Sequence, residues 1–418
     1  MRQREKLSSR LGFILLSAGC AIGLGNVYRF PILAGEYGGA VFVLIYIVFL
    51  LLLGLPCMTA ELAVGRASQR SIATSFDKLE RPGQKWHLMK YLGIAGNYLL
   101  MMFYTCISGW MVLYFIKYLS GSILSAQGDT ALGAVFSETV GNVWLTLGAT
   151  LTSIAICFLI CSLGLQKGVE RITKWMMVVL FLLMIGLAIY SLTLENAAEG
   201  LKFYLVPSWE RMREAGIGTI ISLDTSVALI SGLIIFPACF TYSGGVSTDA
   251  GTVGAGFLFT TLSSIFNAMP GGRIVGALFF LFMIFAAFST LIAVFENIIS
   301  FWLELTPLSR RTISFINIAL IALLSLPCVF SLNIWSNVTV FGKNFMDLED
   351  FIVSNLLLPI GALIYVLFCT VRYGWGWERF AAEVNTGNRG LILPRWIRPY
   401  MTFLLPLIIL SVLIMSVI

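Results

Sequence analysis

The sequence predicts an all-α membrane protein with about ten membrane-spanning helices. Of its 418 residues, 58% are hydrophobic and only 11% are charged, whereas soluble domains carry roughly 25% charged residues. In a transmembrane β-barrel, apolar residues alternate with polar residues along each strand. Here the apolar residues form continuous runs instead. This composition excludes a soluble enzyme, a disordered protein and a nucleic-acid-binding protein, despite the net charge of +6.

The number of spans follows from the apolar runs, since a bilayer core of about 30 Å requires about 20 apolar residues per helix. Runs of this length cover residues 11–34, 40–63, 91–116, 142–165, 175–194, 217–241, 274–303, 313–332, 351–371 and 399–418. The segments between them are short. We therefore expect a single transmembrane domain over residues 1–418.

The sequence offers little for enzyme chemistry. His87 is the only histidine, which leaves no histidine dyad and no HExxH zinc motif. The eight cysteines lie inside apolar runs without a CxxC pair, so we expect small core residues and no disulfide framework. We therefore expect that the protein is not an enzyme.

Lysine and arginine favour cytoplasmic loops, and in the first half of the chain they place the N-terminus inside. After residue 195 the pattern inverts: if all ten runs cross, the loops that hold Arg310, Arg311 and the basic residues of 372–398 fall outside. Either 250–272 crosses the membrane or a helix is absent between about 195 and 273. We favour absence, because 250–272 is rich in Gly, Ser and Thr and contains a proline.

The first apolar run, SRLGFILLSAGCAIGLGNVYRFPILAGEYGGA, is interrupted at its middle by Gly19, Gly23 and Gly25. Glycine loosens a helix, and freed backbone carbonyls within a membrane are tolerated where they line a cavity. The alternative is that these glycines allow helices to pack closely.

The longer string resembles the first helix of the neurotransmitter:sodium symporter family, which contains sodium-coupled amino-acid and amine transporters. The resemblance continues through GLPCMTAELAVGR (54–66), FNAMPGG (266–272), FAAFSTLIAVFENIISFWLEL (285–305) and MDLEDFIVSNLLLPIGAL (346–363). It implies a leucine-transporter-like fold of two inverted five-helix repeats, each beginning with a broken helix. The repeats would cover 11–194 and, incompletely, 217–371, followed by an extra C-terminal helix at 399–418.

The resemblance also implies sodium-coupled symport, with Na⁺ bound at two sites near the helix breaks. One site would use the carbonyl oxygens of Gly19, Ile22 and Ala286 and the hydroxyls of Ser289 and Thr290. The alternative for the two hydroxyls is a hydrogen bond back to their own helix.

The other sodium site would use the carbonyl of Ala21 and the side chains of Asn26 and Asp224. Acids within apolar runs are costly and usually functional. The alternative is a water-exposed acid near a helix end. The fixed negative charge of Asp224 would replace the chloride that some relatives need, so the chloride requirement stays open.

Substrate recognition would begin at the broken first helix, because exposed amides and the positive end of a helix dipole suit a carboxylate. The residues concerned are Cys20, Ala21, Gly23 and Gly25. Tyr104 matches the family tyrosine whose hydroxyl helps to hold that carboxylate, although it could also be an aromatic packing residue. Val294 and Thr290 would flank the side chain of the substrate.

Two charged pairs would act as gates in this family. Arg29 with Asp350 would close the outer vestibule, and Arg4 with Glu304 the inner one. Snorkelling of charged side chains near membrane ends is the alternative for the inner pair. Glu61 would brace the break of the first helix through hydrogen bonds.

The sixth helix of the family, which is its second broken helix, has no counterpart in this sequence. Residues 199–217 match the extracellular stretch after the fifth helix, and 222–240 already match the seventh helix. One lost crossing explains the inverted charge pattern. The missing helix also raises a second hypothesis. The protein would then be a relative of the family that no longer transports, either a decayed gene product or a membrane protein retained for binding a partner.

The expected partners are an amino-acid-like small molecule, sodium ions and the lipid bilayer. We expect a multi-pass protein of the plasma membrane with a cytoplasmic N-terminus, and the compact loops favour a bacterial membrane. The substrate identity and the oligomeric state stay open.

Overall fold

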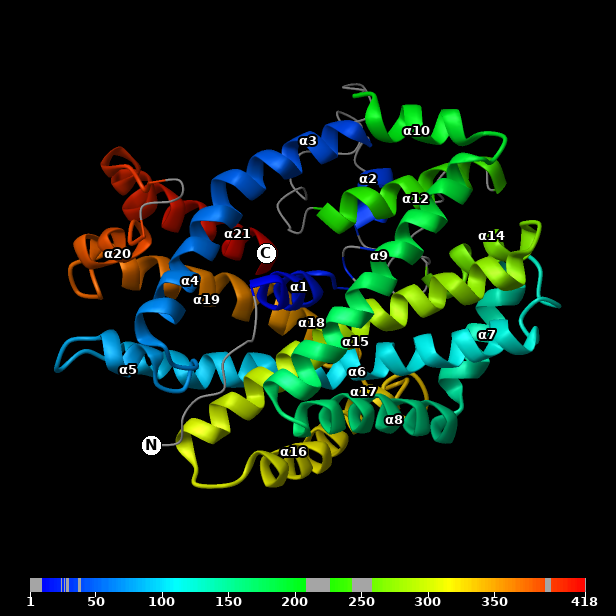
Figure 1. Cartoon of the computed structure of the whole chain (residues 1–418). Helices are drawn as coiled ribbons and strands as arrows, with labels where there is room; N and C mark the ends of the chain where they lie inside the picture. Colours follow the sequence, from blue (N-terminus) through cyan, green and yellow to red (C-terminus); the bar gives the residue numbers. More distant parts are fainter. Residues whose placement is uncertain are drawn as a thin grey trace. The chain divides into compact units, whose positions relative to one another are not determined.

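A computed structural model describes residues 10–23, 25, 27, 30–36, 39–207, 226–242, 258–387 and 392–417. These residues form helices and the segments that connect them, with no β-strand among them, which confirms the all-α prediction (Figure 1). Within this part of the chain, 8 helical segments are long and apolar enough to cross a membrane. The chain is therefore a multi-pass membrane protein.

Eight of the predicted runs coincide with these segments: Ala40–Ser68, Trp86–Ser120, Val143–Ser162, Gly168–Leu192, Gly272–Leu305, Arg310–Phe330, Phe345–Thr370 and Arg395–Ser416. The first predicted run forms two short helices instead, α1 (Arg10–Ala21) and α2 (Phe30–Glu36). The run 217–241 corresponds to α12 (Ser226–Tyr242), whose first residue is also the first one described after residue 207.

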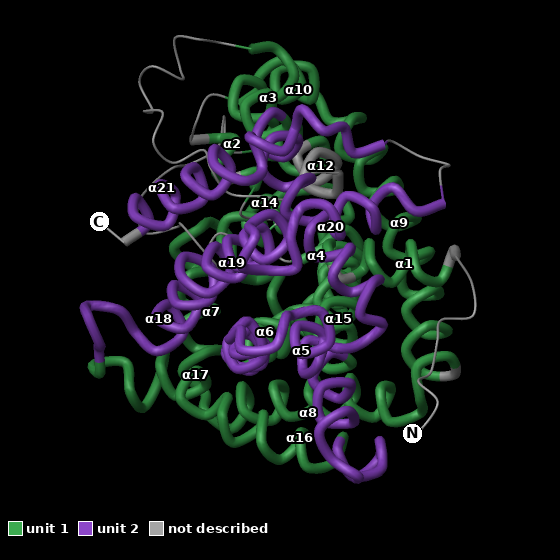
Figure 2. The backbone as a smooth tube through the Cα atoms, turned by 90° about the vertical axis from the view of Figure 1, so that its left-hand side faces the viewer, with its two compact units in different colours: residues 1–47, 102–296, 314–338 green, residues 48–101, 297–313, 339–418 purple. Residues whose placement is uncertain are grey.

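Two compact units are distinguished in Figure 2. The first contains residues 1–47, 102–296 and 314–338, and the second contains 48–101, 297–313 and 339–418. Besides α1, α2 and α12, the helices wholly or mainly in the first unit are α3 (Ala40–Phe49), α6 (Met89–Ser120), α7 (Asp129–Gly141), α8 (Val143–Ser162), α9 (Arg171–Leu192), α10 (Ala197–Leu205), α14 (Thr261–Ala268), α15 (Gly272–Leu305), α16 (Arg310–Leu324) and α17 (Leu326–Phe330). Those of the second unit are α4 (Leu55–Ser68), α5 (Ser75–Leu79), α18 (Phe345–Phe351), α19 (Leu358–Thr370), α20 (Trp377–Val384) and α21 (Leu405–Val417).

Helix α9 is central to the packing of the first unit, because α1, α10 and α12 all contact it. The hydroxyl of Ser191 on α9 donates to the carbonyl of Ile234 on α12 at 2.5 Å. Helix α10 also lies along α12 (Figure 1). Their close approach requires Gly200, since a Cβ there would lie 2.7 Å from the carbonyl carbon of Phe236.

The FNAMPGG motif forms the turn between α14 and α15. The Asn267 amide donates to the carbonyls of Ile123 and Ala126 at 2.9 and 2.7 Å, which fixes the turn that follows α6. Gly272 is required at the start of α15, because a Cβ there would lie 1.8 Å from the carbonyl oxygen of Phe266. Both contacts give this motif a structural role.

The second unit is built around α4 and α19, which pack against each other, while α5 and α20 contact α4 and α21 contacts α19. Its core includes Ala60 and Ala63 on α4 and Phe368 on α19. An ion pair of 2.6 Å between Arg66 and Glu383 joins α4 to α20. Apolar burial and this pair together hold the unit.

The predicted absence of a sixth spanning helix falls on residues outside the described part of the chain. Only residues 208–225 separate the described segment after α10 from the start of α12. This is fewer than the about 20 residues that a spanning helix requires. The absence of that helix stays a prediction.

Replacing Asn267 by alanine tests the structural role of the FNAMPGG motif. Asn267→Ala removes the side-chain donor to the Ile123 and Ala126 carbonyls, and Ile123 then keeps only the amide of Ala126, so we expect the free energy of unfolding to fall by about 1–3 kcal/mol. Denaturant unfolding in mild detergent measures this loss. Asn196→Ala is the control, because Asn196 is exposed and its side chain does not cap α10; equal stability of the two variants would contradict the assignment.

Candidate functional site

Helix α1 ends at Ala21, in the middle of the first apolar run, where the three glycines predict an interruption. The amide of Gly23 donates to the carbonyl of Ala21 at 2.9 Å. In a continuous helix that amide would bond to the carbonyl of Gly19. The Gly19 carbonyl is therefore open to groups from a neighbouring helix.

Five oxygen atoms of the first unit converge at this break. The hydroxyl oxygen of Ser289 lies 2.9 Å from the carbonyl oxygens of both Gly19 and Ala286. The hydroxyl oxygen of Thr290 lies 3.3 Å from the carbonyl oxygens of Gly19, Ile22 and Ala286. All five residues are buried. The structure thus brings together every residue predicted for the first sodium site.

The cluster has more acceptors than donors. Its two hydroxyls carry one hydrogen each, whereas three carbonyl oxygens and two hydroxyl oxygens offer lone pairs. Both hydroxyls do bond back to Ala286 on their own helix, as the alternative interpretation predicts, but Thr290 also faces two carbonyls of the first apolar run. Such an oxygen set suits a hard cation, and the lack of a carboxylate among the five favours a monovalent one.

The position of α1 depends on the missing side chain of Gly19. A Cβ there would lie 3.0 Å from the sulfur of Met177 on α9 and 3.0 Å from the Cβ of Ser289 on α15. This spacing is tighter than ordinary van der Waals contact. Glycine is therefore needed for the Gly19 carbonyl to reach the two hydroxyls.

Tyr104, on α6, lies beside the same break. A Cβ at Gly23 would lie 3.7 Å from its hydroxyl oxygen, and Tyr104 itself is only 7% exposed. Val294 follows Thr290 by one helical turn, so the two share a face of α15, and both are buried. The break, the tyrosine hydroxyl and this face of α15 thus belong to one unit.

Gly25 has open space around it, since no atom would lie within 4 Å of a Cβ there. Several other predicted positions lie outside the described residues: Arg4, Asn26, Arg29, Asp224 and the side chain of Cys20. The second sodium site is therefore represented by Ala21 alone, which is exposed. Its composition stays a prediction.

The two acidic residues predicted to act as gates, Glu304 and Asp350, lie in the second unit. The carboxylate of Glu304, at the end of α15, accepts hydrogen bonds from the amide and hydroxyl of Ser71 and from the hydroxyl of Thr74, at 2.9, 2.8 and 2.7 Å. Asp350 accepts a bond from the hydroxyl of Ser354 at 2.8 Å. The pairings with Arg4 and Arg29 stay predictions.

Glu61 lies on α4 with its side chain on the exposed face of the helix. The described contacts assign it no role at the break, so that role also stays a prediction. Three residues that contact predicted site residues were not identified from the sequence: Met177, Ser71 and Thr74. None of them belongs to a motif. The only feature of the sequence that could have indicated a contact is the position of Ser71 and Thr74, three residues apart, just after α4.

Comparisons with known proteins identify relatives over the whole chain. The sequence model of the family described as "Sodium:neurotransmitter symporter family" matches residues 4–132 and 135–219. An uncharacterized sodium-dependent transporter of Bacillus subtilis, YhdH, is 34% identical over 92% of this chain and 91% of its own length. Another uncharacterized sodium-dependent transporter, from Haemophilus influenzae, is 28% identical over 99% of this chain and 98% of its own.

A solved structure has the same fold. The crystal structure of MhsT in complex with L-phenylalanine matches with a TM-score of 0.83 and 32% sequence identity, over 99% of this chain and 100% of that one. This match confirms the leucine-transporter-like fold class expected from the sequence.

The role of the cluster in sodium binding can be tested by filling the space at Gly19. If the cluster binds sodium, the unfolding temperature is higher in sodium than in potassium. Gly19→Ala pushes α1 away from Ser289 and Met177, so we expect this variant to lose most of that difference. The control is Gly186→Ala on α9, because a Cβ there meets nothing within 4 Å. Thermal unfolding in the two salts measures the effect, and an unchanged sodium response in Gly19→Ala would refute the assignment.

Proposed function

Because the chain belongs to the sodium:neurotransmitter symporter family, we propose that it couples sodium entry to the uptake of an amino acid or a related small zwitterion. Its relatives are sodium-dependent transporters, and the family consists of symporters, not enzymes. The observation that carries the proposal for this chain is the cluster of five buried oxygens at the break of α1.

Sodium would link α1 to α15 in this mechanism. In the absence of an ion, the Ser289 and Thr290 hydroxyls donate to the carbonyls around them. A bound cation would turn these hydroxyl oxygens into ligands, so their hydrogens must point away from the cluster. The ion thereby replaces several weak hydrogen bonds and fixes the separation of the two helices.

The substrate would bind directly beyond the ion. Gly23 follows the sodium ligand Ile22 and lies beside the hydroxyl of Tyr104. A carboxylate placed there would accept bonds from that hydroxyl and from an amide beyond the end of α1, such as that of Gly25. Sodium that orders the break would therefore also order the carboxylate site, which is the physical basis of coupling.

The nature of the substrate is inferred from its surroundings. The amino acid bound in the MhsT structure is L-phenylalanine, and we propose an amino acid here as well. Its side chain would meet Val294 and Thr290, which share a buried, mainly apolar face of α15 with a single hydroxyl group, and the resemblance to the family adds Cys20. This surface favours an apolar side chain over a charged one.

The remaining parts of the proposal follow the family. Ala21, Asn26 and Asp224 would hold a second sodium ion, and the pairs Arg29–Asp350 and Arg4–Glu304 would close the two sides alternately, with Glu61 bracing the break. We place the chain, as one transporter domain, in a bacterial plasma membrane with its N-terminus in the cytoplasm.

One coupled ion supplies enough free energy for concentrative uptake. A tenfold sodium gradient provides about 1.4 kcal/mol, and a membrane potential of about 100 mV adds about 2.3 kcal/mol. Together they sustain a substrate gradient of several hundredfold, on the order of 500.

Uptake into proteoliposomes tests the function directly. We expect radiolabelled L-phenylalanine, or another member of an amino-acid pool, to accumulate under an inward sodium gradient but not under a potassium gradient. Equal uptake in the two gradients, or none for any amino acid, would contradict the proposal.

Thr290 provides the matched variants. Thr290→Val keeps the shape but removes the hydroxyl, so we expect the sodium concentration for half-maximal uptake to rise by about tenfold or more, as for a lost bond to a charged group. Thr290→Ser keeps the hydroxyl and should stay within about threefold of the parent protein. Equal sodium dependence of the two variants would show that the hydroxyl is not a ligand.

A further inference from the structure

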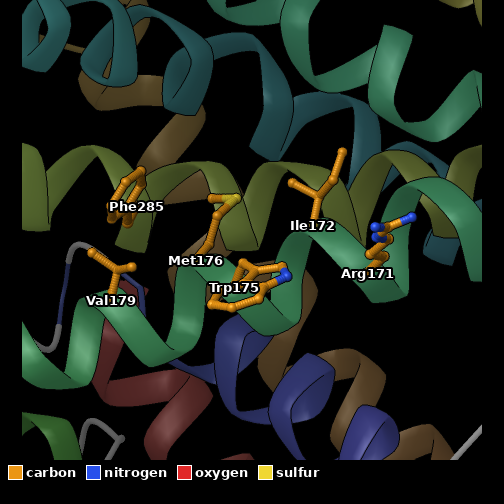
Figure 3. A pocket seen from close by; sticks show the side chains of 6 residues that line it. All are labelled: Arg171, Ile172, Trp175, Met176, Val179 and Phe285. Atoms are coloured by element: carbon orange, nitrogen blue, oxygen red, sulfur yellow. The ribbon is translucent and has the colours of Figure 1, made fainter.

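The first unit contains an apolar groove between α9 and α15, separate from the oxygen cluster. It has a volume of about 260 Å³ and is lined by Arg171, Ile172, Trp175, Met176, Val179 and Phe285. Five of these six side chains are uncharged and largely hydrocarbon. Figure 3 shows the sixth, Arg171, at one end of the row, while Val179 and Phe285 lie at the other end.

The groove has the length of one membrane leaflet. Arg171 and Val179 are eight residues apart on one helix, which corresponds to about 12 Å along its axis. Half of a bilayer core is about 15 Å thick. Because Arg171 begins the apolar span of α9, the groove extends from the headgroup level toward the middle of the bilayer.

Arg171 carries a charge that the described part of the chain does not neutralise. Its neighbour Glu170 is 2% exposed and already pairs with Lys174 at 2.7 Å. The guanidinium of Arg171 is exposed and has no hydrogen-bond or ion-pair partner among the described residues. A planar guanidinium in this position suits a phosphate, to which it can donate two parallel bonds.

The rest of the groove, beyond Arg171, suits an acyl chain. Trp175 is 68% exposed and lies along the row between Arg171 and Val179 (Figure 3). Tryptophan is typical of the membrane interface, where its ring contacts both headgroups and hydrocarbon. Met176 is buried and forms part of the lining.

We propose that this groove is a binding site for an anionic phospholipid, with the phosphate on Arg171 and one acyl chain along Trp175, Val179 and Phe285. The combination of a guanidinium that has no partner among the described residues with an apolar bed about one leaflet deep carries the assignment. A peptide would instead leave its backbone amides without partners in such a bed.

Native mass spectrometry of the full chain in mild detergent tests the site with two lipids of identical acyl chains, phosphatidylglycerol and phosphatidylcholine. We expect phosphatidylglycerol to bind more tightly, and Arg171→Gln to weaken its binding about fivefold. Arg372→Gln is the control, because Arg372 is also exposed and has no partner among the described residues. It should leave the binding unchanged.

A second pair of variants tests the apolar bed with the charge intact. Val179→Trp fills the groove and should abolish the preference for phosphatidylglycerol. Val178→Trp is the control, because Val178 is 44% exposed and does not line the groove.

Equal binding of the two lipids, or a preference that survives both Arg171→Gln and Val179→Trp, would overturn the proposal. A change of oligomeric mass caused by Val179→Trp alone would also overturn it, since a second copy of the chain would then be the occupant. The same spectra report the lipid and the oligomer, and a folded control variant excludes a general loss of structure.

Discussion

Backbone carbonyls within a membrane need partners, and this constraint governs the first apolar run. Ending α1 at Ala21 leaves the carbonyl of Gly19 without the bond from the Gly23 amide that a continuous helix would provide. An unpaired carbonyl costs several kcal/mol in hydrocarbon. Ser289 and Thr290 on α15 provide the partners, so the break can exist only where that helix lies against it.

The same arrangement would give the proposed sodium site its ion selectivity and its coupling to the substrate. Close approach at Gly19 holds the carbonyls near the hydroxyls, and the lack of a carboxylate disfavours divalent ions. Because Gly23 directly follows Ile22 and lies beside the Tyr104 hydroxyl, an ion that orders the break would also order the place where a carboxylate would bind. In the proposed mechanism, a single interrupted helix would thereby serve both the ion and the substrate.

Much of the fold could be predicted from the sequence, since the apolar runs directly reflect the thickness of the bilayer. Eight of these runs are spanning segments, and the glycines of the first run mark a real interruption. The convergence of Gly19, Ile22, Ala286, Ser289 and Thr290 follows from the family resemblance alone. Spacing could not have shown it, because α1 and α15 are about 270 residues apart.

Other contacts could not be read from any pattern. Met177 is one apolar residue among many on α9, and only the position of α1 identifies it as the neighbour of Gly19. The carboxylate of Glu304 binds Ser71 and Thr74, which are ordinary loop residues in the sequence. The family resemblance pairs Glu304 with Arg4, which lies outside the described residues, and it gives no indication of the two hydroxyls.

We infer that the oxygens of Gly19 and Ile22 and those of α15 form a sodium site without a ligand from any other helix. Binding of radioactive sodium to the purified protein, with and without excess unlabelled sodium, measures this site. We expect saturable binding that is lost in the double variant Ser289→Ala with Thr290→Val and retained in part by Asp224→Asn. Saturable binding that persists in the double variant would contradict it.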